Sequence, residues 1–237
     1  MTNVVSLNNV DHADLKLVRA DAGAETAINQ ALVFPNEFEQ LQREFPILFR
    51  KGPDEAFQAV VLLGLDRDEN LFVVDQRWRT RIVPALLQRG PFSIGIPAQG
   101  GEDAGPMIHV DLDDPRVSRT EGVALFHDHG GNTPLLDHIA AVLRTIYAGL
   151  DLSAPMFAAF EAEGLIENAA LTIALDDAHR YRLNDYYTLD AERFASLDGA
   201  ALERLHRAGF LGCAMWALSS LGNIARLIEL KNERRHG

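Results

Sequence analysis

The chain contains a single cysteine, Cys213, so no intramolecular disulfide can form. Within the apolar stretch 210–216, this thiol is expected to behave as a small hydrophobe. No uninterrupted apolar run reaches the ~20 residues that a membrane-spanning helix needs. The first residues also lack the positive charge and apolar run of a signal peptide. These absences predict a cytoplasmic protein without a membrane span, the alternative being a cell-surface location reached by a non-classical route.

Positive charge is scarce as well: 22 Lys and Arg stand against 34 Asp and Glu, for a formal net charge of -12. Nucleic acids and anionic membranes require a basic footprint, so neither is expected as a partner. The locally basic residues 231–236 at the chain end are expected to be a solvated tail. Nucleotide-binding, nucleophile-elbow, zinc-protease and Cys-x-x-Cys signatures are all missing from the sequence.

Hydrophobic patterning changes from strand-like to helix-like along the chain. The nearly continuous apolar run 57–65, a turn at 66–70 and a returning strand at 71–74 predict a central hairpin over 57–74. After Thr133-Pro134 the apolar spacing becomes helical. The sequence therefore predicts an α+β fold in a single domain, 1–237, strand-rich over 1–130 and helix-rich over 131–237. Helices are expected from residue 134 to 146 and at 153–163, 190–195, 199–207 and 210–230.

Two short segments have spacings reminiscent of metal sites. Asp66-x-Asp68-x-Asn70 opens like a calcium loop, but its sixth and twelfth positions are Leu71 and Arg77, where Gly and an acid are needed. A polar turn is the expected structure there. His127 and His129 would share one side of an extended segment and could hold one ion, whereas the glycines that follow favour a solvated loop.

A third pattern suggests an enzyme. His109-x-Asp111 on a predicted strand, with His179 farther along, matches the facial triad of non-haem Fe(II) oxygenases. The helix-rich region between them does not suit the jelly roll that such a triad occupies.

Arginines gather around one tryptophan in this acidic chain. Arg77, Arg79, Arg81 and Arg89 flank or follow Trp78. Alternating arginines on an extended segment share one face, a geometry suited to binding carboxylate or phosphate. The alternative is that these arginines form ion pairs with some of the 34 acidic side chains, while Trp78 covers the edge of the core.

The order of several short segments resembles the bacterial SapC family, over about residues 8 to 230. The segments that carry the resemblance are 45–49, 61–65, 70–73, Trp78, 83–87, 89–92, the strand with Asp111, 125–126, Thr133-Pro134, Leu197, Leu202, Leu205, 209–211 and 219–221.

What the resemblance implies is limited, because the family has no established activity. One member is linked to a surface layer, and family genes neighbour TonB-dependent receptors and flavin-dependent tryptophan halogenases. The family is distinct from the transporter permease of the same name. Its pattern includes Trp78, Pro84, Arg89, Pro91 and Phe92, but not His109 or the His127/His129 pair.

The leading hypothesis is a non-enzymatic binding or accessory protein that needs no cofactor and supports a surface-layer or TonB-dependent uptake or metabolite system. Its recognition residues would be Arg77, Trp78, Arg79, Arg89 and Phe92, and its partner another protein or a small anionic ligand. The alternative is a non-haem Fe(II)-dependent oxygenase-like enzyme that uses His109, Asp111 and His179.

Overall fold

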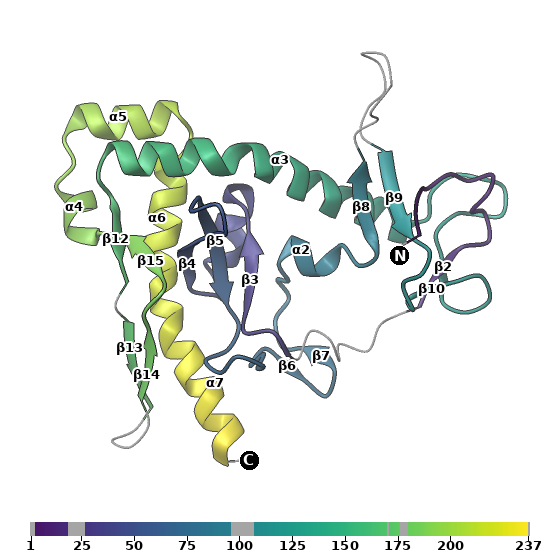
Figure 1. The fold of residues 1–237 in the computed structure, drawn as a ribbon, viewed down its shortest axis with the longest axis horizontal. Helices are drawn as coiled ribbons and strands as arrows, with labels where there is room; N and C mark the ends of the chain where they lie inside the picture. The colour runs from purple at the N-terminus through teal and green to yellow at the C-terminus, as the bar shows by residue number, and fades with distance from the viewer. Residues whose placement is uncertain (1–2, 19–26, 96–106, 170, 176–179, 237) are drawn as a thin grey trace. The chain divides into compact units, whose positions relative to one another are not determined.

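The computed structural model describes residues 3–18, 27–95, 107–169, 171–175 and 180–236, and it divides into two compact units. Unit 1 comprises Met1–Asp21 and Ala85–Tyr147, and unit 2 comprises Ala22–Pro84 and Ala148–Gly237. Antiparallel strands dominate the first half of the chain and helices the second, which confirms the α+β class (Figure 1). The single domain over 1–237 stays a prediction.

Unit 1 contains two small antiparallel sheets. The first has the order β1 (Val4–Ser6), β9 (Met107–Asp111), β8 (Phe92–Gly95), and in the second β2 (Lys16–Leu17) lies between β10 (Val117–Ser118) and β11 (Val123–Ala124). Short helix α2 (Ala85–Gln88) precedes β8. The first half of α3 (Pro134–Ala162) completes the core, whose buried members are Leu15, Phe92, Val110, Leu125, Phe126, Leu136, Ile139 and Leu143.

Unit 2 is built on a five-stranded antiparallel sheet (Figure 1). The strand order is β12 (Ile166–Asn168), β15 (Tyr187–Leu189), β4 (Ile47–Lys51), β5 (Phe57–Leu62), β3 (Gln30–Val33). Val60 and Val61 of β5 point to opposite faces of the sheet and are both 0% exposed, so both faces are covered. This explains why the β5 run is almost continuously apolar. On the face of Phe49, the second half of α3 contributes Phe157 and Phe160, with ring centres 5.1 and 6.3 Å from that of Phe49.

The structure corrects the expected partner of the central strand. The hairpin partner of β5 is the preceding strand β4, with Leu48 opposite Val60, and not the segment 71–74. Within that segment, β6 (Val73–Val74) pairs instead with β7 (Arg77–Trp78). Local turn chemistry diverts the chain: the Asn70 Oδ1 atom accepts the Phe72 amide at 2.9 Å before a second strand can form.

The remaining elements are mostly helical and also belong to unit 2. They are the short helices η2 (Pro35–Glu37) and α1 (Phe38–Leu41), the hairpin β13 (Leu171–Ala174) with β14 (Arg180–Leu183), and α4 (Ala191–Ala195), α5 (Gly199–Arg207), α6 (Leu211–Ser220), η3 (Leu221–Asn223) and α7 (Ile224–His236).

Side-chain caps begin two of these helices. The Asp190 carboxylate accepts the Arg193 amide at α4, and the Asp198 carboxylate accepts the Ala201 amide at α5.

The two helices expected at 134–146 and 153–163 are one helix, α3, with Pro155 inside it. Proline removes one backbone donor, but a helix can continue through it when neighbouring contacts hold it. One such contact is at Gly149, where an added Cβ atom would lie 2.3 Å from that of Phe34. The close packing of α3 here explains why the predicted interruption does not occur.

Within the part of the chain that the structure describes, one helical run, Leu211–His236, is long and apolar enough to cross a membrane, a test that a core helix of a globular protein also passes. Its contacts place it in the packing of unit 2. Ala214 and Ser220 are 0% exposed, and the Ser220 Oγ atom accepts the Ile47 amide of β4 at 2.9 Å while donating to the Ala217 carbonyl at 2.6 Å. The expected absence of a membrane span stays a prediction.

The Ser220 hydroxyl gives a direct test of how the C-terminal helices are fastened to the sheet. Ser220→Ala leaves the buried Ile47 amide without its acceptor, so we expect the free energy of unfolding to fall by about 1–3 kcal/mol. The exposed neighbour Ser219 is the matched control, and Ser219→Ala should change it by less than about 0.5 kcal/mol. Urea unfolding followed by circular dichroism measures both, and equal effects would contradict the assignment.

Candidate functional site

The arginine cluster starts on a very tight hairpin. Val74 pairs with Arg77, leaving only Asp75 and Gln76 in the turn, with φ angles of 49° and 59°. Two-residue turns with both φ positive match the twist of a hairpin, but they normally use Gly or Asn. Non-glycine residues in this conformation cost about 1–3 kcal/mol each and persist only where the surrounding structure holds them. The hairpin therefore requires an anchor.

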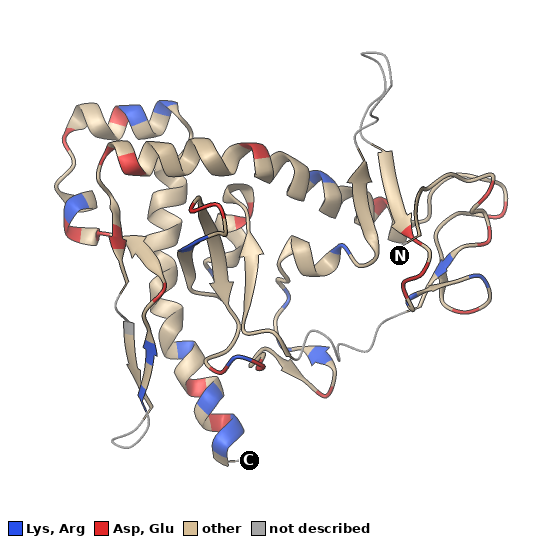
Figure 2. Ribbon diagram, viewed as in Figure 1, with Lys and Arg blue, Asp and Glu red and all other residues tan. Residues whose placement is uncertain are grey.

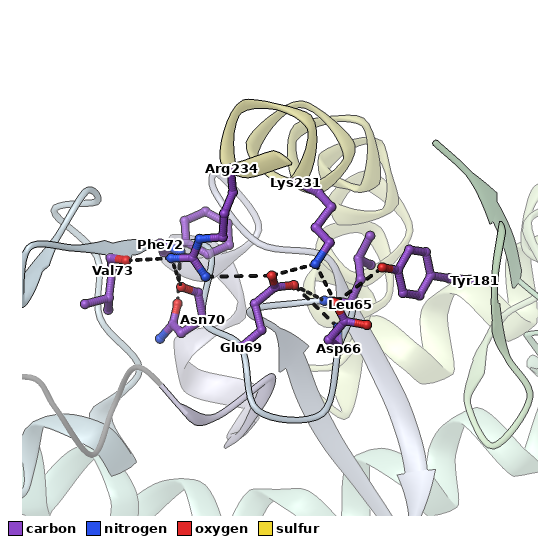
Figure 3. Close-up of polar contacts among 9 residues, drawn as sticks. All are labelled: Leu65, Asp66, Glu69, Asn70, Phe72, Val73, Tyr181, Lys231 and Arg234. Carbon is purple, nitrogen blue, oxygen red and sulfur yellow. Dashed lines mark hydrogen bonds and ion pairs between the residues drawn. The ribbon is translucent and has the colours of Figure 1, made fainter. Parts of the chain in front are cut away.

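Helix α7 provides that anchor. The Arg234 Nη2 atom donates to the Asn70 and Val73 carbonyls at 3.2 and 3.1 Å, at the entry to the hairpin (Figure 3). At its exit, the Arg79 amide donates to the Phe72 carbonyl at 2.7 Å, and the Arg79 guanidinium pairs with Glu233 at 2.9 Å. Both ends of the hairpin are thus bound, and α7 supplies a contact at each.

A buried ion cluster fixes α7 in turn. The Lys231 ammonium lies 2.5 Å from an Asp66 carboxylate oxygen and 2.6 Å from one of Glu69, and Arg234 approaches Glu69 at 3.7 Å (Figure 3). Lys231 and Glu69 are each only 7% exposed. The Tyr181 hydroxyl donates to Asp66 at 3.3 Å, and the Tyr181 ring centre lies 5.9 Å from the ammonium.

The Lys231 amine is held in its charged form. Burial by itself lowers its pKa, but the hydrogen bonds to Asp66 and Glu69 outweigh burial and raise the pKa above its ordinary value. An amine that stays protonated at neutral pH between two carboxylates is an anchor and not a nucleophile. The expectation of a solvated tail at 231–236 is therefore wrong for Lys231 and Arg234, which bind the turn at 66–73.

The basic side chains of this region differ in how far they are engaged. Among the described residues, Arg77 and Arg81 are exposed and have no ion-pair partner, whereas Arg79 is paired. Trp78 is half-buried beside them. Figure 2 shows basic and acidic residues alternating along α7. The helix that anchors the hairpin therefore carries charges of both signs. Arg77 is thus the exposed arginine of the hairpin itself without an ion-pair partner among the described residues.

The other two predicted recognition residues lie in unit 1. Phe92 is 1% exposed and packs in the core of that unit, so its ring is covered there. The Arg89 Nη1 atom donates to the Phe92 carbonyl at 3.0 Å. The predicted set is thus divided: unit 2 holds Arg77, Trp78 and Arg79, and unit 1 holds Arg89 and Phe92.

The residues of the iron hypothesis are placed only in part. His109 and Asp111 lie on β9 with one residue between them, and the Asp111 carboxylate accepts the Asp113 amide at 3.1 Å. The His109 ring fills the space above Gly95, where an added Cβ atom would lie 2.1 Å away. His179 lies outside the described residues. No group of three or more potential metal ligands occurs within the described ranges.

The two weaker metal patterns form turns. His127 and His129 are exposed and stack on each other, with ring centres 5.5 Å apart, in a turn that the His127 amide closes on the Gly131 carbonyl. In the expected polar turn at 66–70, Asp66 and Glu69 are bound by Lys231.

Comparison with known proteins shows the family to which the chain belongs. The class defined by the structure is an α+β protein that presents an arginine hairpin anchored by its last helix. The profile of the SapC family matches residues 7–227 of 237, so the chain belongs to the SapC family, as the resemblance indicated. No curated protein and no solved structure matches it.

The buried ion cluster predicts a large difference between two cations of α7. Lys231→Met removes the main partner of the buried Glu69 carboxylate, so we expect a loss of about 3–5 kcal/mol in the free energy of unfolding. Arg226→Met is the control, because its pair with Glu229 is exposed, and it should cost at most about 1 kcal/mol. Chemical denaturation at neutral pH measures both, and equal losses would rule out the anchoring role.

The same cluster makes the stability of the folded protein depend on pH in the alkaline range. Because the pKa of Lys231 is raised above 10.5 in the folded protein, its stabilisation is fully present below pH 10.5 and is lost as pH rises through the higher folded value. In Lys231→Met this alkaline component of the unfolding profile should be missing.

Cys213 is expected to be unreactive in the folded protein. It is 5% exposed, its Sγ atom lies 3.7 Å from the Pro35 carbonyl, and burial raises its pKa to about 11. At pH 8 we therefore expect no reaction with a chromogenic disulfide reagent until urea unfolds the chain, when one thiol should react. Rapid labelling of the native protein would contradict this.

Proposed function

We propose that this SapC-family protein is a non-enzymatic binding protein that recognises a carboxylate-bearing partner through the hairpin at residues 73–78. The observation that carries the proposal is the exposed Arg77 directly after a strained turn, next to the half-buried Trp78. Backbone strain is typically retained at functional sites. Arginine presents a planar fork of donors that matches a carboxylate.

The anchoring by α7 supports this role physically. Arg79 is paired with Glu233, and Arg234 donates to two backbone carbonyls of the segment 70–73. These two arginines hold the hairpin, and Arg77 is left to make an external contact. A binding group on a fixed scaffold loses less conformational freedom when a partner arrives, which favours affinity. The proposed recognition residues of unit 2 are accordingly Arg77 as the contact, Trp78 as its apolar neighbour and Arg79 as a positioning residue.

We further propose that this binding supports a bacterial surface-layer or TonB-dependent uptake or metabolite system, the setting that family membership suggests. The Fe(II) oxygenase alternative is tested separately. Protein purified without an affinity tag should show a thermal shift with Fe(II) if that alternative holds, and His109→Ala should abolish the shift.

A salt-dependent binding experiment tests the hairpin. The probe is a fluorescent peptide of eight glutamates, whose anisotropy is measured with increasing protein at low and at physiological ionic strength. We expect saturable binding that Arg77→Ala weakens about three- to tenfold, because one charge-assisted contact is lost. Arg182→Ala removes an exposed arginine from another two-stranded hairpin of unit 2 and should leave binding unchanged.

The control separates a specific contact from net charge. Equal weakening in Arg77→Ala and Arg182→Ala would mean that the peptide responds only to overall charge. No binding of the peptide by the wild-type protein would contradict recognition of carboxylates by this hairpin.

A further inference from the structure

Unit 2 contains a hollow that is lined by residues outside the hairpin at 73–78. It measures about 420 Å³, and its walls are the beginning of β5, the end of β3 and the second half of α3. Apolar side chains form most of its surface, among them Val33, Phe57 and Phe157, while α3 contributes the small residues Ala154 and Ala158. Hollows of 300–1,000 Å³ with mainly apolar walls and a few polar groups are typical small-molecule sites.

Aromatic rings give the hollow a defined wall. Phe57 stacks on Phe157, with ring centres 5.6 Å apart and planes at 29°, and Tyr187 meets Phe57 edge-on at 5.1 Å. Phe157 is in turn held by Phe49 at 5.1 Å, and it is only 4% exposed. The faces of such rings carry negative potential, so they attract cations as well as apolar groups.

The charged groups of the lining are of one sign. Glu55 and Glu161 belong to it, and no Lys or Arg does. The cation beside it, Lys51, is already engaged: its ammonium pairs with Glu55 at 3.1 Å, lies 5.8 Å from the Phe57 ring centre and is attracted more weakly by Glu161. Glu161 is exposed and has no ion-pair partner among the described residues. A smaller hollow of about 300 Å³ shares Phe57 and Glu161 and adds Tyr187.

We infer that this hollow binds a small organic ammonium ligand, with its apolar or aromatic body between Phe57 and α3 and its amine at Glu161. The apolar wall accounts for the body, and the unpaired carboxylate accounts for the charge. A carboxylate-bearing ligand would meet two like charges there, and the cation beside them, Lys51, is already paired with Glu55. This site lies outside the hairpin and takes a ligand of opposite charge, so it goes beyond the proposed function and can fail independently of it.

Three probes that differ only in their end group test the inference: 2-phenylethylammonium, the neutral 2-phenylethanol and the anion 3-phenylpropanoate. Binding is followed by amide chemical shifts in ¹⁵N-labelled full-length protein. The ammonium probe should bind most tightly and shift amides of residues 55–59 and 153–161. Glu161→Gln should weaken it about three- to tenfold without changing the affinity for the neutral probe.

Two further variants complete the design. Glu167→Gln removes an exposed acid from β12, outside both hollows, and should leave binding of the ammonium probe unchanged. Ala158→Phe fills the hollow from an exposed position of α3, and it should abolish binding while the circular dichroism spectrum stays the same. Equal affinity for all three probes, equal loss in Glu161→Gln and Glu167→Gln, or unchanged binding in Ala158→Phe would each overturn the inference.

Discussion

The buried ion pair between Lys231 and Glu69 is the contact on which the C-terminal part of unit 2 depends. Each side chain is only 9% exposed, so neither charge has water as a substitute partner. The pair fastens α7 to the turn that follows β5, and Arg234 on the next turn of the helix then reaches the carbonyls of Asn70 and Val73. The direction of the chain after β5 is thus fixed by a contact across 162 residues.

This contact explains both the correction to the central hairpin and the geometry of the candidate site. The segment 71–74 has the composition of a strand that could return along β5, but it is bound to α7 where that return would start. The chain instead makes its tight turn at Asp75 and Gln76 and brings Arg77 to the surface. The local turn at Asn70 and the long-range contacts of α7 therefore act together to determine which residue the hairpin exposes.

The sequence predicted those elements whose structure depends on residues that are close together in the chain. The apolar pattern of β4 and β5 and the helix at 199–207 follow from local spacing, and all three are found close to the predicted residues. The alternating positions of Arg77 and Arg79 in the chain could also be recognised from the sequence. The pairing partner of β5 could not be predicted in this way, because the apolar segments 47–50 and 71–74 both have strand-like composition and both lie next to β5 in the sequence. The sequence also did not predict that Arg77 and Arg89 lie in different units, because the units are defined by contacts between segments that are far apart in the sequence.

The net charge of -12 suggests that this protein should repel anions, yet local arrangement decides what each surface can bind. At physiological ionic strength charges are screened over about 8 Å, so a ligand responds mainly to the groups beside it. At the hairpin, Glu233 and Glu69 are neutralised by Arg79, Lys231 and Arg234, which leaves the charge of Arg77 unopposed by those carboxylates. In the hollow the balance is reversed, because the single charge of Lys51, which pairs with Glu55 and is weakly attracted by Glu161, stands against two carboxylates. The pairing of charges, and not their total, therefore underlies the opposite preferences that we propose for the hairpin and the hollow of unit 2.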